Sequence, residues 1–225
     1  DLQDAHKFGS LVRLNEKLDV HISALRTSNA MLFSEQEAES SEKFKQSFLN
    51  NLEQAFNRFS IQQGNPFLTD KTKDAITFLK LITQKYDVAT ANPPYTDSAD
   101  FGTELKKFID ANYAKPYKFN TNLYASFIKR CFELTNENGK VAMIHPRTFM
   151  FIKTFEDVRK FILDKTHLNV FIDYSLSNLF GSIMVDPAFY VFEKGIKTTD
   201  ESLFVSLDQY TRTPNEKFKK DFTLE

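Results

Sequence analysis

Apolar residues recur at helical spacing through the first third of the chain. One set repeats at steps of three and four residues, which places its members on a single helix face. This set is Leu11, Leu14, Leu18, Ile22 and Leu25. A polar break at 34–41 precedes a second stripe, made of Phe44, Phe48, Leu52, Phe56 and Phe59. The two stripes predict a helical hairpin whose aromatic residues form core rather than a ligand site.

A third helix is predicted over residues 69–85, after a break at 62–67 that contains Gly and Pro. Thr69 or Asp70 suits its N-cap, because a short polar side chain there accepts a hydrogen bond from a free backbone N–H group. Residues 1–85 are therefore predicted to form a helical insert region.

From Tyr86 onward, short apolar strands alternate with amphipathic helices. The predicted strands are 87–92, 140–146, 168–175 and 188–195, and the predicted helices are 121–138 and 154–165. Gly139 suits the end of the first helix, and Thr154 with Asp157 is close to a capping box for the second. The order predicts an α/β fold over residues 86–200, with a parallel sheet covered on its faces and one late strand added directly. Residues 201–225 are predicted to begin a following region.

Composition excludes several classes of protein. The chain has 225 residues, 41% of them apolar and 24 of them Phe, so it can bury a core. No window approaches 18 uncharged apolar residues, the first ten residues lack a secretion pattern, and Cys131 is the only cysteine. A cytoplasmic protein is expected, with no membrane partner, no internal disulfide and no metal site.

Charge is distributed unevenly along the chain. The net charge is −1, yet residues 101–165 carry twelve Lys or Arg against seven Asp or Glu. The loop expected after residue 97 holds Lys106, Lys107, Lys115 and Lys118. These lysines suit the DNA backbone, although an ordinary solvated surface often has the same imbalance. Both interpretations stay open.

The stretch Asn92-Pro93-Pro94-Tyr95, at the end of a predicted strand, carries the clearest chemical signal. Ligands of open α/β sheets bind beyond the carboxyl ends of the strands. Each proline fixes its own φ and restricts the residue before it. The Asn92 amide and the Pro93 carbonyl can therefore converge as two rigid acceptors beside the Tyr95 ring.

Two acceptors and a flat ring suit a planar molecule that carries an amino group, such as an adenine flipped out of DNA. Asn92 takes up no proton at neutral pH, so it would bind and position the amine rather than act as a general base. The alternative is a Pro-Pro turn in which the Asn92 side chain closes a local hydrogen bond. Arg147 follows a predicted strand end and Pro146, where it either contacts a DNA phosphate or belongs to a structural turn.

The segment YDVATANPPY at 86–95 resembles the catalytic motif of amino-methyltransferases that use S-adenosyl-L-methionine, and its Asn-Pro-Pro-Tyr form resembles that of DNA adenine-N6 methyltransferases. The helix, Gly turn, strand and Pro expected over 122–151 resemble the order in these enzymes. HKFGSLVRL at 6–14, followed by a long helical insert, is similar to PglX-type methyltransferases of phage-exclusion systems and to type IIG restriction–modification enzymes. The resemblance covers most of the chain and is strongest over 84–195.

The resemblance implies a partial Rossmann-like methyltransferase sheet, the half that binds the target base. It implies that Asn92 and Pro93 bind the target amine, that Pro94 belongs to the same catalytic motif, and that Tyr95 stacks on the base. Phe180 is implied to cover the other face of the flipped adenine. Double-stranded DNA and other subunits of a restriction or antiviral defence system are the implied partners.

The glycine-rich turn that holds the methyl donor in such enzymes is missing from the sequence. The chain has six glycines, and no two of them lie within three residues of each other. The chain begins with Asp1, and residues 211–225 look like the start of another unit. We therefore expect a fragment of a longer methyltransferase, with the main S-adenosyl-L-methionine site outside it and little activity in isolation.

Two other functions remain open from the sequence. Asn-Pro-Pro-Tyr also occurs in enzymes that methylate glutamine in proteins or guanine in RNA. A non-catalytic interaction module of a defence complex would account for the missing glycine turn, but it would give the intact Asn92–Tyr95 stretch no purpose.

Overall fold

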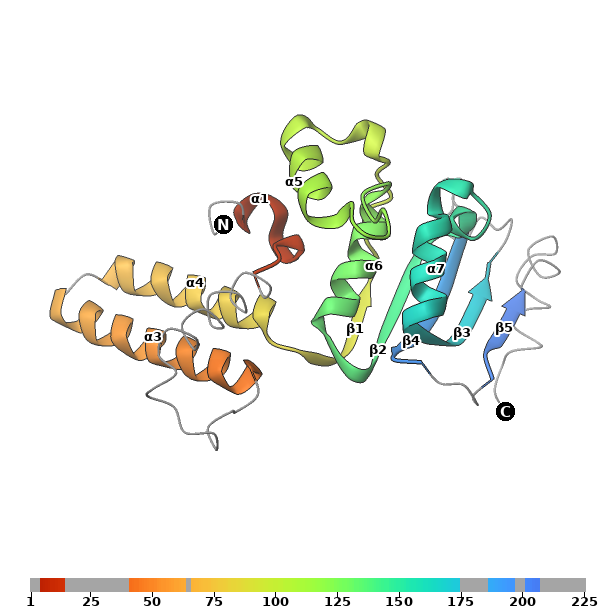
Figure 1. The fold of residues 1–225 in the computed structure, drawn as a ribbon. Coiled ribbons are helices and arrows are strands. Elements are labelled where there is room, and N and C mark those ends of the chain that lie inside the picture. The colour runs from red at the N-terminus through yellow and green to blue at the C-terminus, as the bar shows by residue number, and fades with distance from the viewer. Residues whose placement is uncertain (1–4, 15–40, 64–65, 175–185, 197–200, 207–225) are drawn as a thin grey trace, which may run out of the picture. The chain divides into compact units, whose positions relative to one another are not determined.

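The computed structural model describes residues 5–14, 41–63, 66–174, 186–196 and 201–206 (Figure 1). The chain divides into two compact units, residues 1–84 and residues 85–225. Within the described ranges, no helix has the length and apolarity needed to cross a membrane.

The regular elements that the structure describes in the unit of residues 1–84 are all helices or helical turns. It contains α1 (Ala5–Phe8), the 3-10 turn η2 (Gly9–Leu11), α3 (Ser41–Gln63) and α4 (Pro66–Thr83). The helices α3 and α4 pack on each other, and an ion pair of 2.5 Å joins Lys80 Nζ to Glu53 Oε2. The predicted third helix is confirmed as α4, but its predicted N-cap is wrong, since the helix begins at Pro66 and contains Thr69 and Asp70. Proline is tolerated at this first position because its missing N–H would have no partner in the helix.

The stripe predicted for the second helix is wrong at one position. Phe48 is 45% exposed and Leu49 is 2% exposed, so the buried face is displaced by one residue there. Leu18, Ile22 and Leu25, which belong to the first predicted stripe, lie outside the described residues.

The unit of residues 85–225 contains a five-stranded sheet of order β1-β2-β4-β3-β5. The strands are β1 (Tyr86–Ala91), β2 (Thr135–Pro146), β3 (Thr166–Asp173), β4 (Pro187–Lys194) and β5 (Leu203–Ser206). β1 runs parallel to β2, and β5 runs parallel to β3. β4 lies between β2 and β3 and is antiparallel to both. The α/β prediction is confirmed, with a mixed sheet in place of a parallel one and an additional strand, β5, that the pattern did not predict.

Three helices accompany the sheet: α5 (Thr103–Tyr113), α6 (Leu123–Leu134) and α7 (Glu156–Lys165). α6 packs on β1 and β2, α7 packs on β3, and both lie on the same face of the sheet (Figure 1). Within the described part of residues 85–225, no helix packs on the opposite face, so the predicted covering of both faces is not seen in this unit. α5 occupies a stretch that was predicted as loop, and Lys106 and Lys107 belong to it.

Two predicted helix boundaries in the unit of residues 85–225 are also wrong. α6 ends at Leu134, and Gly139 lies inside β2 rather than at a helix end. An added Cβ at Gly139 would lie 2.4 Å from Thr135 Cγ2 and 2.9 Å from the Asp87 carbonyl oxygen, so close packing accounts for this glycine. α7 has Phe155 as its N-cap without a side-chain cap. Asp157 instead pairs with Lys118 at 2.8 Å.

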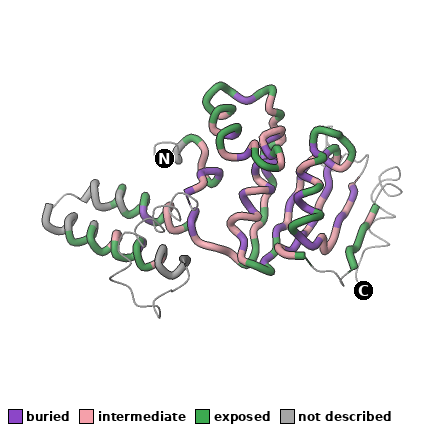
Figure 2. Tube along the Cα trace, in the orientation of Figure 1, coloured by how far each residue is buried: buried purple, intermediate pink, exposed green. Residues whose placement is uncertain are grey.

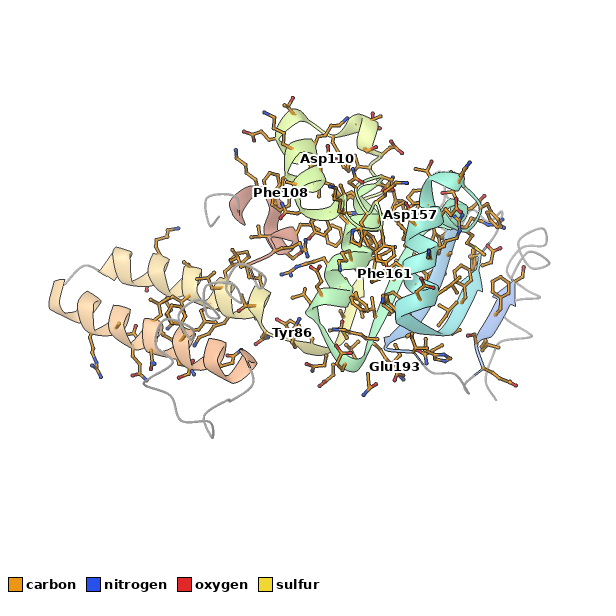
Figure 3. All side chains as sticks on the ribbon, viewed as in Figure 1. Tyr86, Phe108, Asp110, Asp157, Phe161 and Glu193 are labelled. Carbon is orange, nitrogen blue, oxygen red and sulfur yellow. The ribbon has the colours of Figure 1, made fainter. Side chains whose placement is uncertain are left out.

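The core lies between the sheet and its two helices. Val141, Met143 and His145 alternate along β2 as buried residues, which is the period of two expected of a strand with one covered face. Buried residues are concentrated in α6, β2 and β4 (Figure 2). Phe161 of α7 is labelled in Figure 3. Its ring centroid lies 4.8 Å from that of Phe132 in α6 and 5.0 Å from that of Phe119, which precedes α6.

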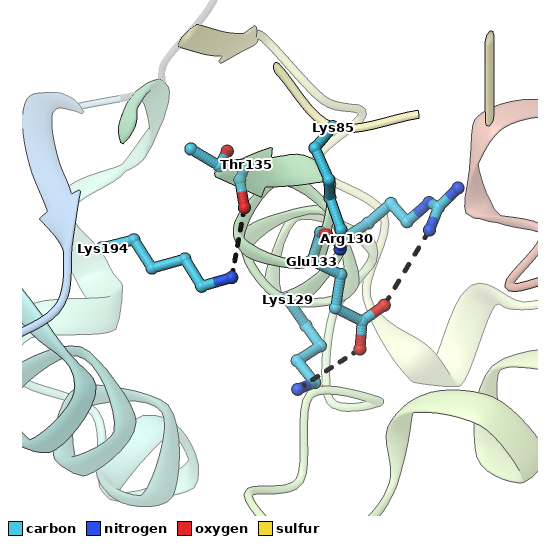
Figure 4. Close-up of polar contacts among 6 residues, drawn as sticks. All are labelled: Lys85, Lys129, Arg130, Glu133, Thr135 and Lys194. Atoms are coloured by element: carbon cyan, nitrogen blue, oxygen red, sulfur yellow. Dashed lines mark hydrogen bonds and ion pairs between the residues drawn. The ribbon is translucent and has the colours of Figure 1, made fainter. Parts of the chain in front are cut away.

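Polar contacts secure the other end of the sheet, where α6 runs into β2 (Figure 4). Glu133 pairs with Lys129 at 3.3 Å and with Arg130 at 4.0 Å. Lys85 donates to the Glu133 carbonyl, and Lys194 Nζ donates to the Thr135 carbonyl at 3.1 Å. These charged groups lie at the amino ends of β1 and β2, so they hold the fold together away from the carboxyl ends, where Asn92 lies.

Candidate active site

The Asn92–Tyr95 stretch begins where β1 ends, at the carboxyl edge of the parallel pair β1 and β2. Ala91 is opposite Met143 of β2, so Asn92 follows directly on the last paired residue. Asn92 and Pro94 are exposed, Pro93 is buried and Tyr95 is half-buried. Pro93 therefore anchors the turn while the Asn92 side chain remains accessible.

The side chains of Asn92 and Tyr95 contact each other. The Tyr95 hydroxyl donates to Asn92 Oδ1 at 2.9 Å. Burial raises the pKa of Tyr95, so this hydroxyl keeps its proton and remains a donor at neutral pH. A local bond of this kind is what the alternative of a structural turn predicts. The amide oxygen has a second lone pair, however, so the bond fixes its direction without using its whole capacity as an acceptor.

Backbone hydrogen bonds fasten the motif to the start of α6. Leu123 N donates to the Thr96 carbonyl at 2.9 Å, and Ser98 N donates to the Thr121 carbonyl at 3.2 Å. Asn122 caps α6 by accepting from Tyr124 N at 3.2 Å. The turn that carries Asn92 is therefore held by β1 on one side and by a capped helix on the other, which limits the movement of its side chains.

A hollow of about 490 Å³ opens beside Asn92, on the sheet face opposite α6 and α7. Asn92 and Thr90 contribute polar side chains to the lining, whereas the Tyr190 hydroxyl is buried against His145 and the remaining lining is apolar. The lining residues are Thr90, Ala91, Asn92, Ala142, Met143, Ile144, Val170, Ile172, Phe189, Tyr190 and Val191. The hollow offers an apolar surface that ends at an amide.

His145 does not line this hollow. Its ring is fully buried, stacked on Tyr124 with a centroid distance of 4.4 Å. Nδ1 lies 3.1 Å from the Pro146 carbonyl and Nε2 lies 2.8 Å from the Tyr190 hydroxyl. A carbonyl can only accept, so Nδ1 carries the proton and Nε2 accepts from Tyr190. Burial lowers the pKa of His145 to about 4, which keeps the ring neutral, and we assign it a structural role behind the site.

Arg147 lies at the carboxyl end of β2, at the same edge as Asn92. Its Nη2 pairs with Asp173 Oδ2 at 2.8 Å, and its guanidinium lies 5.1 Å from the centroid of the Phe151 ring. The sequence assigned no role to Asp173. Arg147 directly follows β2, and Asp173 is the last residue of β3.

Phe180 lies outside the described residues, so its predicted place over the base stays a prediction. The structure brings Asn92, Pro93, Pro94 and Tyr95 together in one turn and places Arg147 at the end of the adjacent strand. Within the described ranges, no three His, Cys, Asp or Glu side chains are grouped so that they could hold a metal ion.

The known proteins that this chain resembles are methyltransferases. Residues 13–180 match the protein family described as "Eco57I restriction-modification methylase". The chain is 31% identical over 84 residues to the adenine-specific methyltransferase BrxX of Escherichia coli O9:H4 (strain HS), which is 37% of this chain and 7% of that protein. It is 29% identical over 117 residues to the adenine-specific methyltransferase PglX of Lacticaseibacillus casei (strain Zhang), which is 50% of this chain and 9% of the relative.

Among solved structures, the DrdV–DNA complex is similar with a TM-score of 0.48 and 18% identity, over 62% of this chain and 16% of that chain. The chain thus spans less than a tenth of the length of the BrxX and PglX relatives.

Proposed function

Because the chain belongs to the Eco57I restriction-modification methylase family, we propose that it is the target-base half of a DNA adenine-N6 methyltransferase that uses S-adenosyl-L-methionine. The observation that carries the proposal is the Asn92–Tyr95 turn at the carboxyl end of β1, with an accessible amide above an apolar hollow. The complete protein would serve a restriction–modification or phage-exclusion system in the cytoplasm, and its DNA-binding surface would extend beyond this chain.

Asn92 and Pro93 bind the adenine amino group in this proposal. The Asn92 amide oxygen and the Pro93 carbonyl each accept one of the two amino hydrogens, which favours a pyramidal nitrogen whose lone pair is available for attack. The donor, held by other parts of the complete protein, would supply the methyl group. Tyr95 gives the base a flat surface, Pro94 keeps the turn rigid, and Phe180 covers the other face of the base. Asn92 binds and orients the amine, and the surplus proton leaves to water, because an amide is no base at neutral pH.

The donor itself requires groups that this chain does not supply. No two of its six glycines lie within three residues of each other, and the hollow beside Asn92 is almost wholly apolar. A ribose and a charged sulfonium need polar partners, because a polar group without a hydrogen bond is costly to remove from water. We therefore derive no donor contact from these residues and propose that other parts of the complete protein hold it.

The isolated 225-residue chain is accordingly expected to bind S-adenosyl-L-methionine weakly, with a dissociation constant above about 1 mM, which corresponds to less than about 4 kcal/mol of binding free energy. Isothermal titration calorimetry of the purified chain measures this, with the complete protein as the control that binds. Micromolar affinity in the isolated chain would contradict the division of the site.

The chemical product decides between the proposed substrate and its rivals. The complete protein, incubated with unmethylated DNA and isotopically labelled donor, is expected to produce N6-methyladenine, identified by mass spectrometry of the digested nucleosides. RNA and a bacterial protein extract serve as parallel substrates. Label in methylguanine or methylglutamine, with none in adenine, would replace the DNA proposal by one of the other amino-methyltransferase functions. Absence of label from every substrate would favour the interaction module.

A further inference from the structure

An ion pair bridges two strands at the edge of the sheet that carries Asn92. Arg147 directly follows β2, and Asp173 is the last residue of β3. Both strands are antiparallel to β4, which lies between them, so their carboxyl ends lie at the same edge. Arg147 Nη2 reaches across to Asp173 Oδ2 at 2.8 Å.

The same two residues lie next to the residues at which β4 begins. Pro146 is opposite Pro187, and Asp173 is opposite Ala188. Arg147 N donates to the Asp186 carbonyl at 2.8 Å, and Tyr174 N donates to the Pro187 carbonyl at 3.2 Å. Tyr174, directly after β3, and Asp186, directly before β4, are thus each held by a backbone hydrogen bond beside the ion pair.

The side chains of the pair are largely withdrawn from solvent, with Arg147 22% exposed and Asp173 8% exposed. A carboxylate so deeply buried needs a cation close by, because removing a charge from water is costly. Phe151 lies against the Arg147 guanidinium, 5.1 Å from ring centroid to carbon. Arg147 is therefore oriented toward Asp173 and covered by an aromatic ring, rather than extended toward a phosphate in solvent.

We propose that Arg147 is a positioning residue that acts through Asp173. The pair holds the carboxyl ends of β2 and β3 together beside the start of β4, and so fixes Tyr174 and Asp186 relative to Asn92. β2 transmits this placement, because it is the strand that pairs with β1. The inference rests on the proposed function, since it assigns to the pair the alignment of the target base with the Asn92–Tyr95 turn.

A double-mutant cycle in the complete protein tests the pair. Arg147→Gln and Asp173→Asn are each expected to lower kcat for adenine methylation by about tenfold, because small displacements of reacting groups lower the rate strongly. The double variant is expected to lose no more than either single variant, because both changes break one interaction. DNA affinity is expected to stay within about twofold of the wild type. Arg147→Lys keeps the charge but not the planar fork, so it is expected to restore part of the rate.

A fluorescent readout separates positioning from a general loss of structure. With 2-aminopurine at the adenine that the protein methylates, the fluorescence increase on binding reports the base leaving the stack. All variants are measured at a temperature where circular dichroism shows them folded. A reduced or altered 2-aminopurine signal in both single variants is expected, and a wild-type signal with wild-type kcat would overturn the proposal.

The other outcomes are equally distinct. A phosphate contact would make Arg147→Gln weaken DNA binding and reduce the slope of log affinity against log salt by about one, while Asp173→Asn would not. Rate losses that multiply in the double variant would mean independent roles. Either result overturns the proposal. If a single variant fails to fold, the double variant is used instead, because it leaves neither charge of the pair buried alone. A wild-type kcat in the double variant rejects the proposed role of the pair.

Failure of the proposed function gives a different pattern. A wild-type complete protein that methylates no adenine, or an Asn92→Ala variant with unchanged activity, rejects the function. An active wild type with an inactive Asn92→Ala and fully active Arg147 and Asp173 variants rejects only the role of the pair.

Discussion

Replacing Asn92 by Ala is expected to lower N6-methyladenine formation by the complete protein at least about 100-fold, the scale of losing one preorganised hydrogen bond at a reacting atom. Asn92 is exposed at the end of β1, and its oxygen already has a direction fixed by the Tyr95 hydroxyl at 2.9 Å. The variant removes the acceptor that favours a pyramidal amine, so the loss should fall on kcat. Single-turnover rates on a DNA duplex, followed by nucleoside mass spectrometry, measure it.

Three matched variants give this experiment its specificity. Asn92→Asp keeps an acceptor and should retain more activity than Asn92→Ala. Tyr95→Phe keeps the ring and removes only the hydroxyl that bonds Asn92 Oδ1, so a loss of about two- to tenfold is expected, near the net value of one hydrogen bond. Asn120→Ala removes an amide whose Nδ2 donates to Asp110 at 2.7 Å, and it should leave the rate unchanged. Undiminished methylation by Asn92→Ala would refute the catalytic assignment.

The part of the site that could be predicted is the part that is local in sequence. Asn92, Pro93, Pro94 and Tyr95 are consecutive, and the proline rings impose the turn almost independently of the rest of the fold. The alternation of short strands and helices likewise predicted α/β architecture. The antiparallel placement of β4 between β2 and β3 was not predicted, because strand pairing is settled by contacts far apart in sequence.

The wrong predictions also come from contacts between residues far apart in sequence. Gly139 reads as a helix end, yet it lies in β2, where the Asp87 carbonyl of the neighbouring strand leaves no room for a side chain. Asp157 reads as half of a capping box, yet it pairs with Lys118. The Arg147–Asp173 pair joins residues 26 positions apart. Each depends on a neighbour that only the tertiary structure supplies.

Burial determines the role of His145. His145 lies near the end of β2, close to the edge that carries Asn92, but the strand period turns its side chain toward α6 and the core. There it stacks on Tyr124, accepts from Tyr190 and stays neutral. The opposite face of β2 contributes Ala142 and Ile144 to the hollow beside Asn92. One residue of register therefore separates a core position from a site position.

Acidification is expected to destabilise the unit of residues 85–225 through His145. Burial lowers the pKa of this ring from 6.5 to about 4 in the folded chain. Between these two values the unfolded chain binds a proton that the folded chain does not, so the stabilising contribution is fully present above pH 6.5 and is lost as the pH falls toward 4. The loss across this window is about 3 kcal/mol, since each pKa unit corresponds to about 1.4 kcal/mol. Urea denaturation between pH 7 and pH 4.5 measures most of it.

The variant His145→Gln isolates the histidine from the carboxylates, which also titrate in this range. Gln keeps hydrogen-bonding groups near Tyr190 but carries no titrating proton. At pH 7, where the buried ring is neutral, the variant should have a lower free energy of unfolding than the wild type. This difference should shrink by most of the 3 kcal/mol as the pH falls toward 4.5. The two stabilities converge because only the wild type has a ring that takes up a proton in the unfolded chain but not in the folded chain. Parallel stability curves for the two chains would show that His145 is protonated without cost and that its bonds to Pro146 and Tyr190 do not require the neutral ring.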